Sequence, residues 1–226
     1  GQRWQAAIDA AQPWSELEAT ERTQRATTNF RTAQALLDDS RLVNRISEAL
    51  QARGYAGDVR PALLAYLCFT SRLLDRPINL AFVAPSGAGK NTAVDLAKAL
   101  MPAEAFHEIP SSSERALIYD DVAVEHKIVI FSEADSIPDD GPSASAIRSL
   151  VTDNEMAYDT VDKDGGCLRT RHIRKRGPTG LVTTSTRRLP EQMSTRTLEV
   201  AIPDDEHQTR AVLQAQAVDA TARVAR

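Results

Sequence analysis

Residues 78–92 read INLAFVAPSGAGKNT, and this stretch decides the fold. The apolar run at 80–83 predicts a buried strand, and the small residues at 84–89 predict a turn. A helical pattern follows from Thr92 to Leu100. The stretch therefore predicts a strand that enters a helix through a glycine-rich turn.

This turn is a candidate phosphate-binding loop. Small residues let backbone N–H groups close around phosphates, the helix N-terminus adds partial positive charge, and Lys90 can reach the β- and γ-phosphates. The P-loop pattern G-x-x-x-x-G-K-[ST] is matched at Gly89 and Lys90, whereas Ala84 and Asn91 replace its first and last residues. A glycine-rich turn with a chance lysine is the alternative, but the flanking strand and helix argue against it. The predicted nucleotide-binding residues are Pro85, Ser86, Gly87, Ala88, Gly89, Lys90, Asn91 and Thr92.

The composition is that of an ordinary globular chain. It has 226 residues, 42% hydrophobic and 26% charged, enough for one large domain or one domain with a helical appendage. No apolar run approaches membrane-spanning length and no signal peptide is visible, so we expect no membrane partner. Cys68 and Cys167 lack metal-ligand spacing, which favours a reduced, cytoplasmic setting. Because the chain begins at Gly1, we expect it to be a piece of a longer protein.

The chain order predicts three parts. Residues 1–57 are expected to form a helical N-terminal segment, and helical patterns recur at about 41–53 and from 58 onward. Residues 58–203 are expected to form the nucleotide-binding core. Residues 204–226 predict a C-terminal helix that is at best a partial lid.

A second buried strand is predicted in KIVIFSEAD at 127–135. Four consecutive apolar residues suit a strand covered on both faces, and polar residues at its C-terminal end lie where parallel sheets place their ligand sites. The pattern is that of a Walker B strand, which usually ends in Asp-Glu and here ends in Ser132-Glu133. We predict Glu133 as the catalytic base; the alternative is an ordinary strand that ends in a solvated acid.

A basic hairpin is predicted at about 156–176. Asp164-Gly165 is a hairpin-turn signal between two strand-like runs. Six Lys or Arg and one Asp lie between Lys163 and Arg176, in a chain with a net charge of −4. Two interpretations stay open: a solvated hairpin, or a loop with Lys163 at its tip that carries positive charge to a phosphate backbone.

After the hairpin, the sequence predicts one more pair of strands. Residues 181–186 read LVTTST, and strand alternation places Thr184 and Thr186 on one face. A short helix at 189–196 and a last strand at 197–202 follow. Strands and helices therefore alternate along the core, as in an α/β fold.

Five segments together resemble the core of an AAA+ ATPase. They are APSGAGKN, IVIFSEAD, MAYDTVDKDGG, GPTGLVTTST and MSTRTLEV, within residues 58–210. The hairpin before the fourth core strand resembles the pre-sensor-1 hairpin of superfamily 3 and MCM helicases. The family that the chain is most similar to is the helicase domain of phage and mobile-element primase–helicase proteins. The resemblance implies a P-loop NTPase (AAA+) core with a parallel sheet between helices, an inserted β-hairpin and a helical N-terminal part.

The resemblance also implies roles in ATP hydrolysis. Lys90 would bind the phosphates, Glu133 would activate water, and Thr186 would be sensor 1, with Thr184 as the fallback. ATP and Mg²⁺ are the implied cofactors. Asn91 and Ser132 occupy the two positions where the family carries its magnesium ligands, and both side chains are neutral. Magnesium is then expected to be held mainly by the nucleotide and water, or hydrolysis is weakened.

Arg196 falls where the family carries an arginine finger that acts on a neighbouring subunit. Arg187 and Arg188 are rival candidates, and Arg210 is only a guess for sensor 2. The resemblance implies a homo-oligomeric ring, with a hexamer expected, single-stranded DNA as partner, and a primase domain in the same parent chain. The implied DNA-binding residues are Lys163, Arg169, Arg171 and Arg174.

The leading hypothesis is an ATP-dependent DNA-translocating motor, the helicase domain of a replication protein. The alternative is a nucleotide-dependent DNA-binding or scaffolding module with weak or no hydrolysis. A P-loop kinase acting on a small molecule is a third possibility, but such an enzyme would need neither a basic hairpin nor an arginine finger from a neighbouring subunit.

Overall fold

The computed structural model describes residues 14–109, 115–134, 140–164 and 167–224. The chain divides into two compact units, residues 1–46 and 47–226. In the first unit, helix α2 (Trp14–Leu37) leads to α3 (Leu42–Ala52), which crosses the boundary between the units. The described side chains of α2 are almost all exposed. The nucleotide-binding candidates and the hairpin belong to the second unit.

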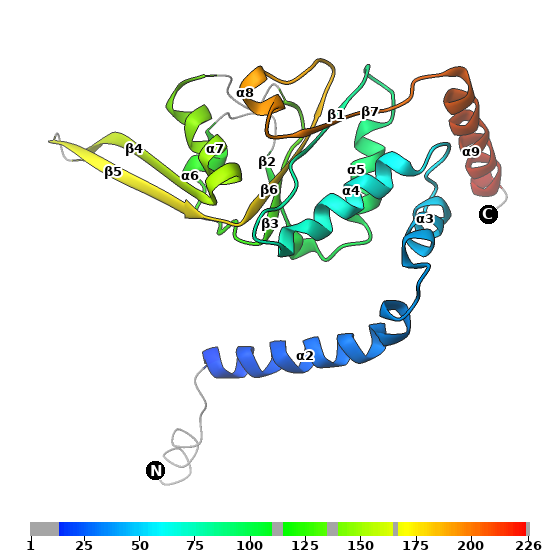
Figure 1. The fold of residues 1–226 in the computed structure, drawn as a ribbon, viewed down its shortest axis with the longest axis horizontal. Helices are drawn as coiled ribbons and strands as arrows, with labels where there is room; N and C mark the ends of the chain where they lie inside the picture. The colour runs from blue at the N-terminus through cyan, green and yellow to red at the C-terminus, as the bar shows by residue number, and fades with distance from the viewer. Residues whose placement is uncertain (1–13, 110–114, 135–139, 165–166, 225–226) are drawn as a thin grey trace, which may run out of the picture. The chain divides into compact units, whose positions relative to one another are not determined.

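The second unit is built on a five-stranded sheet (Figure 1). Its strands lie in the order β2-β3-β6-β1-β7, and each neighbouring pair is parallel. The strands are β1 (Leu80–Val83), β2 (Phe106–Ile109), β3 (Lys127–Phe131), β6 (Thr179–Ser185) and β7 (Leu198–Ala201). The predicted α/β fold, with a parallel sheet between helices, is thereby confirmed.

Helices cover both faces of the sheet (Figure 1). Because side chains alternate along a strand, Leu80 and Phe82 face one way and Ala81 the other. Ala81 joins the buried cluster that includes Val129 and Phe131 from β3. The helices are α4 (Arg60–Thr70), α5 (Lys90–Lys98), α6 (Ala116–Tyr119), α7 (Gly141–Asp153), α8 (Glu191–Ser194) and α9 (Glu206–Val224), with 3₁₀ turns η1 (Ser71–Leu73) and η2 (Ala103–Ala105).

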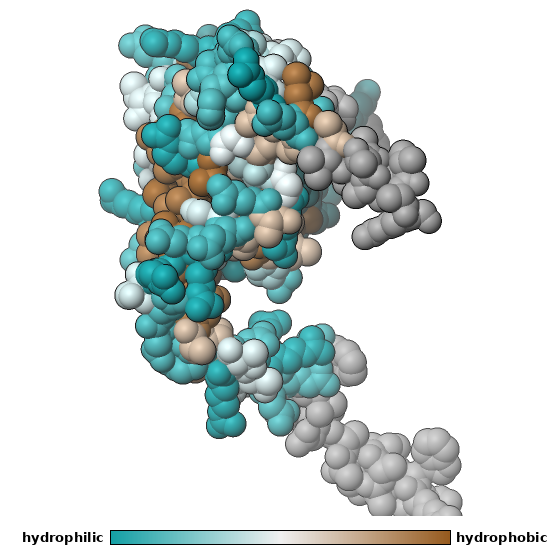
Figure 2. All heavy atoms as spheres, turned by 90° about the vertical axis from the view of Figure 1, so that its right-hand side faces the viewer, coloured by the Kyte–Doolittle hydropathy of each residue, from teal (hydrophilic) through white to brown (hydrophobic). Residues whose placement is uncertain are grey.

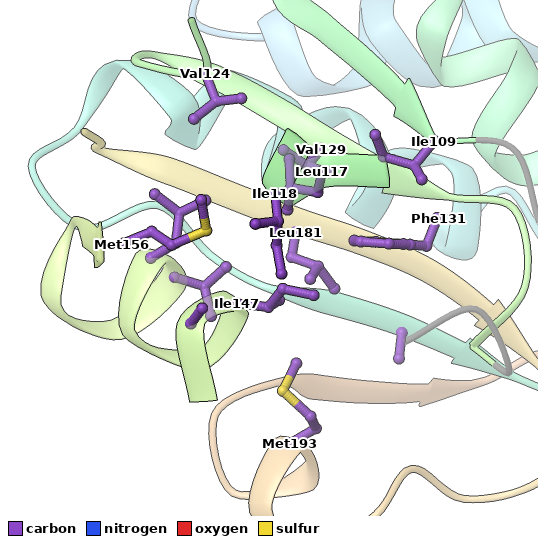
Figure 3. Close-up of a cluster of buried hydrophobic side chains, with 14 of the residues drawn as sticks. Ile109, Leu117, Ile118, Val124, Val129, Phe131, Ile147, Met156, Leu181 and Met193 are labelled. Carbon is purple, nitrogen blue, oxygen red and sulfur yellow. The ribbon is translucent and has the colours of Figure 1, made fainter. Parts of the chain in front are cut away.

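One core cluster holds the sheet, α6, α7 and the base of the hairpin together. Figure 3 shows Leu117 and Ile118 of α6, Ile147 of α7 and Leu181 of β6 gathered around the strands. Met156 at the hairpin base is fully buried in the same cluster. Burial of an apolar side chain of this size stabilises a fold by roughly 1.5–3 kcal/mol, so the hairpin base is fixed to the core.

The predicted hairpin is present as β4 (Glu155–Asp164) and β5 (Cys167–Arg176), which pair antiparallel along their whole length. Its turn at 165–166 lies outside the described residues. Asn154, in the left-handed conformation at φ 60°, joins α7 to β4. Its carbonyl accepts from Gly177 N at 2.8 Å, and its side chain donates to Asp75 O at 2.8 Å. Asn154, just before β4, is thus hydrogen-bonded to Gly177, just after β5, and links the two strands at the base of the hairpin.

Strand β6 differs from the expected 181–186 at both ends. It begins at Thr179, because Thr179 pairs with Lys127 and its hydroxyl donates to Val124 O at 2.8 Å. It ends at Ser185, so Thr186 lies just beyond the strand.

No helix among the described residues is both long enough and apolar enough to cross a membrane. On the face drawn in Figure 2, hydrophobic residues form small groups among hydrophilic ones.

Candidate nucleotide site and basic hairpin

The loop between β1 and α5 has the geometry of a phosphate cradle. Gly87 and Gly89 have φ of 85° and 86°, a left-handed conformation that favours glycine. Gly89 immediately precedes α5, so the loop ends at the positive end of a helix. Lys90 Nζ donates to Ala84 O at 2.6 Å and to Pro85 O at 2.7 Å, which places the ammonium group over the loop.

The loop opens into a cavity of about 340 Å³ at the C-terminal edge of the sheet. The predicted P-loop residues, the predicted base and the predicted sensor meet there, although three different strands carry them. Pro85 and Ala88 are the two predicted loop residues that do not line it. The lining residues are Ser86, Gly87, Gly89, Lys90, Asn91, Thr92, Ser132, Glu133, Ala134, Thr184, Ser185 and Thr186.

Hydrogen bonds tie the ends of β3 and β6 together beside this cavity. The Thr184 hydroxyl donates to Ser132 O at 2.7 Å, and the Thr183 hydroxyl donates to Phe131 O at 3.1 Å. Thr186 is exposed and lines the cavity. Since the Thr184 proton is already donated to a backbone carbonyl, Thr186 is the better placed of the two predicted sensors to meet a ligand.

The predicted metal positions offer neutral oxygen atoms only. Asn91 has an amide carbonyl and Ser132 a hydroxyl, and among the described residues that line the cavity Glu133 is the one carboxylate. No group of three His, Cys, Asp or Glu side chains lies together in the described part of the chain. Magnesium in P-loop sites is bound through a Ser/Thr hydroxyl and an Asp. The residues present therefore do not fit a magnesium ion held by the protein in that way.

Arg196 does not line the cavity of its own chain. Its backbone carbonyl accepts from Asn79 Nδ2 at 3.1 Å, and the Asn79 carbonyl accepts from Leu198 N at 2.8 Å. These contacts lie where β1 and β7 begin, whereas the phosphate cradle lies where β1 ends. Arg196 is exposed there. Its rivals Arg187 and Arg188 follow the end of β6, on the edge that carries the cavity.

A second cavity, which the sequence did not predict, adjoins the phosphate cradle. Its volume is about 820 Å³, and it shares Gly87, Gly89 and Thr92 with the first cavity. Its other walls come from residues 52–56 and 203–216. These segments are about 150 positions apart, and neither carries a recognisable motif, so only the folded structure reveals the cavity.

The hairpin divides the predicted DNA-binding residues between its two faces. In the observed register Lys163 lies opposite Leu168, and Arg171 opposite Thr160. Because side chains alternate, Lys163 and Arg174 share one face and Arg169 and Arg171 share the other. The four predicted DNA-binding residues are thus divided between the two faces, and their role in DNA binding stays a prediction. Alternation along 163–176 was the signal that could have separated them.

The Lys163 face is open and partly apolar. Val161 is 61% exposed and Leu168 75% exposed. On the opposite face Tyr158 and Ile173 pack against the core cluster, and Tyr119 Oη donates to Thr160 Oγ1 at 3.3 Å. One face of the hairpin is thus partly covered by the protein itself, while the other is exposed along its length. On the exposed face Arg174 lies 3.7 Å from Glu155, and His172 lies 2.8 Å from Asp159.

One basic residue of the hairpin is structural. Lys175 is buried and donates to Asp120 O and Val122 O, the latter at 2.9 Å. Burial lowers the pKa of Lys175, and the nearby carboxylates of Asp120 and Asp121 act in the opposite direction. Its charge holds the base of β5 against the segment before β3, so it is unavailable for a ligand.

Comparisons with known proteins give the following. No protein-family model and no curated protein matches the sequence. NtrX from Brucella abortus in complex with ATP is 12% identical, over 91% of this chain and 46% of that chain, with a TM-score of 0.41. The Orc1 protein of Aeropyrum pernix in complex with DNA is 12% identical, over 71% of this chain and 49% of that one, with a TM-score of 0.47. The chain spans about half the length of these structures, and the likeness concerns the fold alone.

The parallel sheet, its strand order, the left-handed glycines of the cradle and the lysine at its end together define an α/β fold with a P-loop-like phosphate cradle.

Proposed function

We propose that this chain is the ATP-hydrolysing motor of a DNA-translocating replication protein, a helicase domain that works as a ring with a hexamer expected. The observation that carries the proposal is the convergence of Lys90, Glu133 and Thr186 on one cavity. The basic hairpin continues through Gly177 and Pro178 into β6, whose end borders that cavity. Strand β6 thus joins a candidate DNA-binding element to the candidate ATP site.

The residues of this chain have distinct roles in hydrolysis. The loop N–H groups, the start of α5 and Lys90 hold the β- and γ-phosphates. The oxygen of a water molecule attacks the γ-phosphorus, the bond from that phosphorus to the β,γ-bridging oxygen breaks, and Glu133 accepts a proton from the water. Thr186 orients the water against the γ-phosphate. Mg²⁺ brought in with the nucleotide would be held mainly by the nucleotide and by water, and would neutralise phosphate charge, since the protein offers only neutral groups at Asn91 and Ser132.

Arg196 is proposed to complete the site of a neighbouring subunit. It is exposed at the edge of the sheet away from its own cradle, and Asn79 fixes its backbone there. A guanidinium supplied in trans stabilises the charge on the transferring phosphoryl group, typically by roughly 10³–10⁵ in rate. The active unit is then an assembly, because each site needs residues from two copies.

DNA is the proposed partner, single-stranded and bound through its phosphates. The Lys163 face of the hairpin presents positive charge beside Val161 and Leu168. Charge grips the backbone without reading its sequence, and apolar side chains can contact bases or sugars. A primase domain in the same parent chain belongs to the same proposal.

A nucleotide-dependent binding or scaffolding module is the second candidate. The neutral pair Asn91 and Ser132 favours it, because loss of both metal ligands would weaken hydrolysis more than binding.

ATP turnover with and without single-stranded DNA, measured over a range of protein concentrations, separates the two candidates. A motor should show turnover that rises with both DNA and protein concentration and is lost in Glu133→Gln. Negligible turnover in an assembled ring that still binds ATP and DNA would support the binding module instead.

A further inference from the structure

The side chain of Gln208 joins α9 to the segment that precedes α4. Its Nε2 donates to Ala56 O at 3.1 Å, and its Oε1 accepts from Asp58 N at 3.0 Å. The amide therefore pairs with a backbone segment in the way that a neighbouring strand would. The partners are about 150 positions apart in sequence, so this contact fixes where α9 lies on the core.

Gly57, between the two hydrogen-bonded residues, makes this approach possible. Its φ is 81°, a conformation that favours glycine. A Cβ atom at this position would overlap the Gln208 amide, at 2.5 Å from Cδ and 2.6 Å from Nε2. Replacement of Gly57 by alanine would therefore push Gln208 and the first turns of α9 away from the segment.

The joined elements form the walls of the second cavity. Tyr55 and Ala56 line it on one side, and Val212 and Leu213 of α9 on the other. Its volume of about 820 Å³ lies within the range of pockets that enclose small organic ligands. Because it meets the phosphate cradle at Gly87, Gly89 and Thr92, a ligand whose phosphates lie in the cradle would extend into it.

We propose that Gln208 is a positioning residue, which holds α9 in place as a wall of the pocket for the nucleoside part of the bound nucleotide. This inference rests on the proposed function, because it takes the ligand of the cradle to be a nucleotide. Gln208 acts through α9 and need not touch the ligand. Val212 and Leu213 then supply apolar surface to a base, and Tyr55 supplies a buried hydroxyl group.

The test compares ATP with inorganic tripolyphosphate, which has the phosphates but no nucleoside. Binding of both probes is measured by calorimetry to the wild type, Gln208→Ala, Gly57→Ala and Gln214→Ala. Gln214 is the matched control, an exposed glutamine on the same helix that does not line the pocket. Gln208→Ala and Gly57→Ala should each weaken ATP binding about tenfold, as expected for the loss of two hydrogen bonds. Their affinity for tripolyphosphate and both affinities of Gln214→Ala should match the wild type.

Unchanged tripolyphosphate binding also shows that the cradle of each variant is folded. Equal losses of ATP and tripolyphosphate would overturn the proposal, because Gln208 would then support the whole fold rather than the nucleoside pocket. Unchanged ATP binding in Gln208→Ala would overturn it as well. If the wild type binds neither probe, the proposed function fails; if it binds tripolyphosphate as tightly as ATP, the cradle stands and the nucleoside pocket fails.

Discussion

The division of the hairpin into two faces predicts which basic residues bind DNA. Lys163 and Arg174 lie on the open face, whereas Arg169 and Arg171 share a face with Tyr158 and Ile173, which pack on the core. The double variant Lys163→Ala/Arg174→Ala should therefore bind single-stranded DNA much more weakly than Arg169→Ala/Arg171→Ala. Each double variant removes two positive charges, so each is the control for the other.

The size of the effect follows from counterion release. In the observed register the two open-face residues are six strand positions apart, or roughly 20 Å, which lets them contact different phosphates of one strand. Each phosphate contact contributes about −0.7 to the slope of log K against log salt concentration for a single strand. Loss of both contacts should reduce the magnitude of the slope by about 1.4, and the affinity at 0.1 M salt roughly 25-fold.

Fluorescence anisotropy of a labelled oligonucleotide, titrated at salt concentrations from 50 to 300 mM, measures both quantities. The Arg169/Arg171 double variant should keep most of the wild-type slope. The reasoning would be refuted if that variant lost as much slope as the Lys163/Arg174 variant, or if neither slope changed.

Three further predictions concern the cavities. Lys90→Ala should weaken ATP binding by roughly 10- to 100-fold in calorimetry, the loss expected for hydrogen bonds from a charged donor. Unaltered affinity would show that the loop does not bind the phosphates of ATP. Wild-type affinity for ATP should differ less than about threefold between Mg²⁺ and EDTA, whereas Asn91→Thr/Ser132→Asp should gain a clear dependence on Mg²⁺; a strong dependence in the wild type would contradict this. Burial, aided by Asp58, raises the pKa of Tyr55 to about 12 from 10.0, so the folded state keeps this proton after the unfolded state has lost it. Between pH 10 and pH 12 the free energy of unfolding of the wild type, measured with urea, should therefore fall by ~2 kcal/mol more than that of Tyr55→Phe. If the two free energies change with pH in parallel, the folded state does not hold the phenol neutral.

Much of the fold is visible in the sequence, because apolar runs, glycine-rich turns and alternation are local signals. The strand at 80–83 has the predicted bounds, and the strand at 127–131 begins where predicted and ends within the expected 127–135. The hairpin also follows local rules, since β4 and β5 differ little from the expected 156–176. Its two faces could have been derived from the same alternation.

Other features depend on contacts between distant parts of the chain. Strand β6 begins at Thr179 because it pairs there with β3. In the sequence, Gly177-Pro178 directly before it predicts a break rather than the start of a strand. The pocket walled by α9 depends on Gln208, and a single exposed-looking glutamine has no signature in a sequence. The place of Arg196 at the far edge of the sheet likewise depends on Asn79, more than a hundred positions away. The roles predicted for Glu133, Thr186 and Arg196 stay predictions.

In the proposed motor, each ATP site uses residues from two copies of the chain. The most direct test mixes two inactive variants, Glu133→Gln and Arg196→Ala, in equal amounts under conditions of assembly, and measures ATP turnover. A shared site predicts that the mixture regains about a quarter of wild-type turnover, because one interface in four pairs an intact Glu133 with an intact Arg196. A mixture as inactive as either variant alone, although the copies assemble together, would contradict the claim.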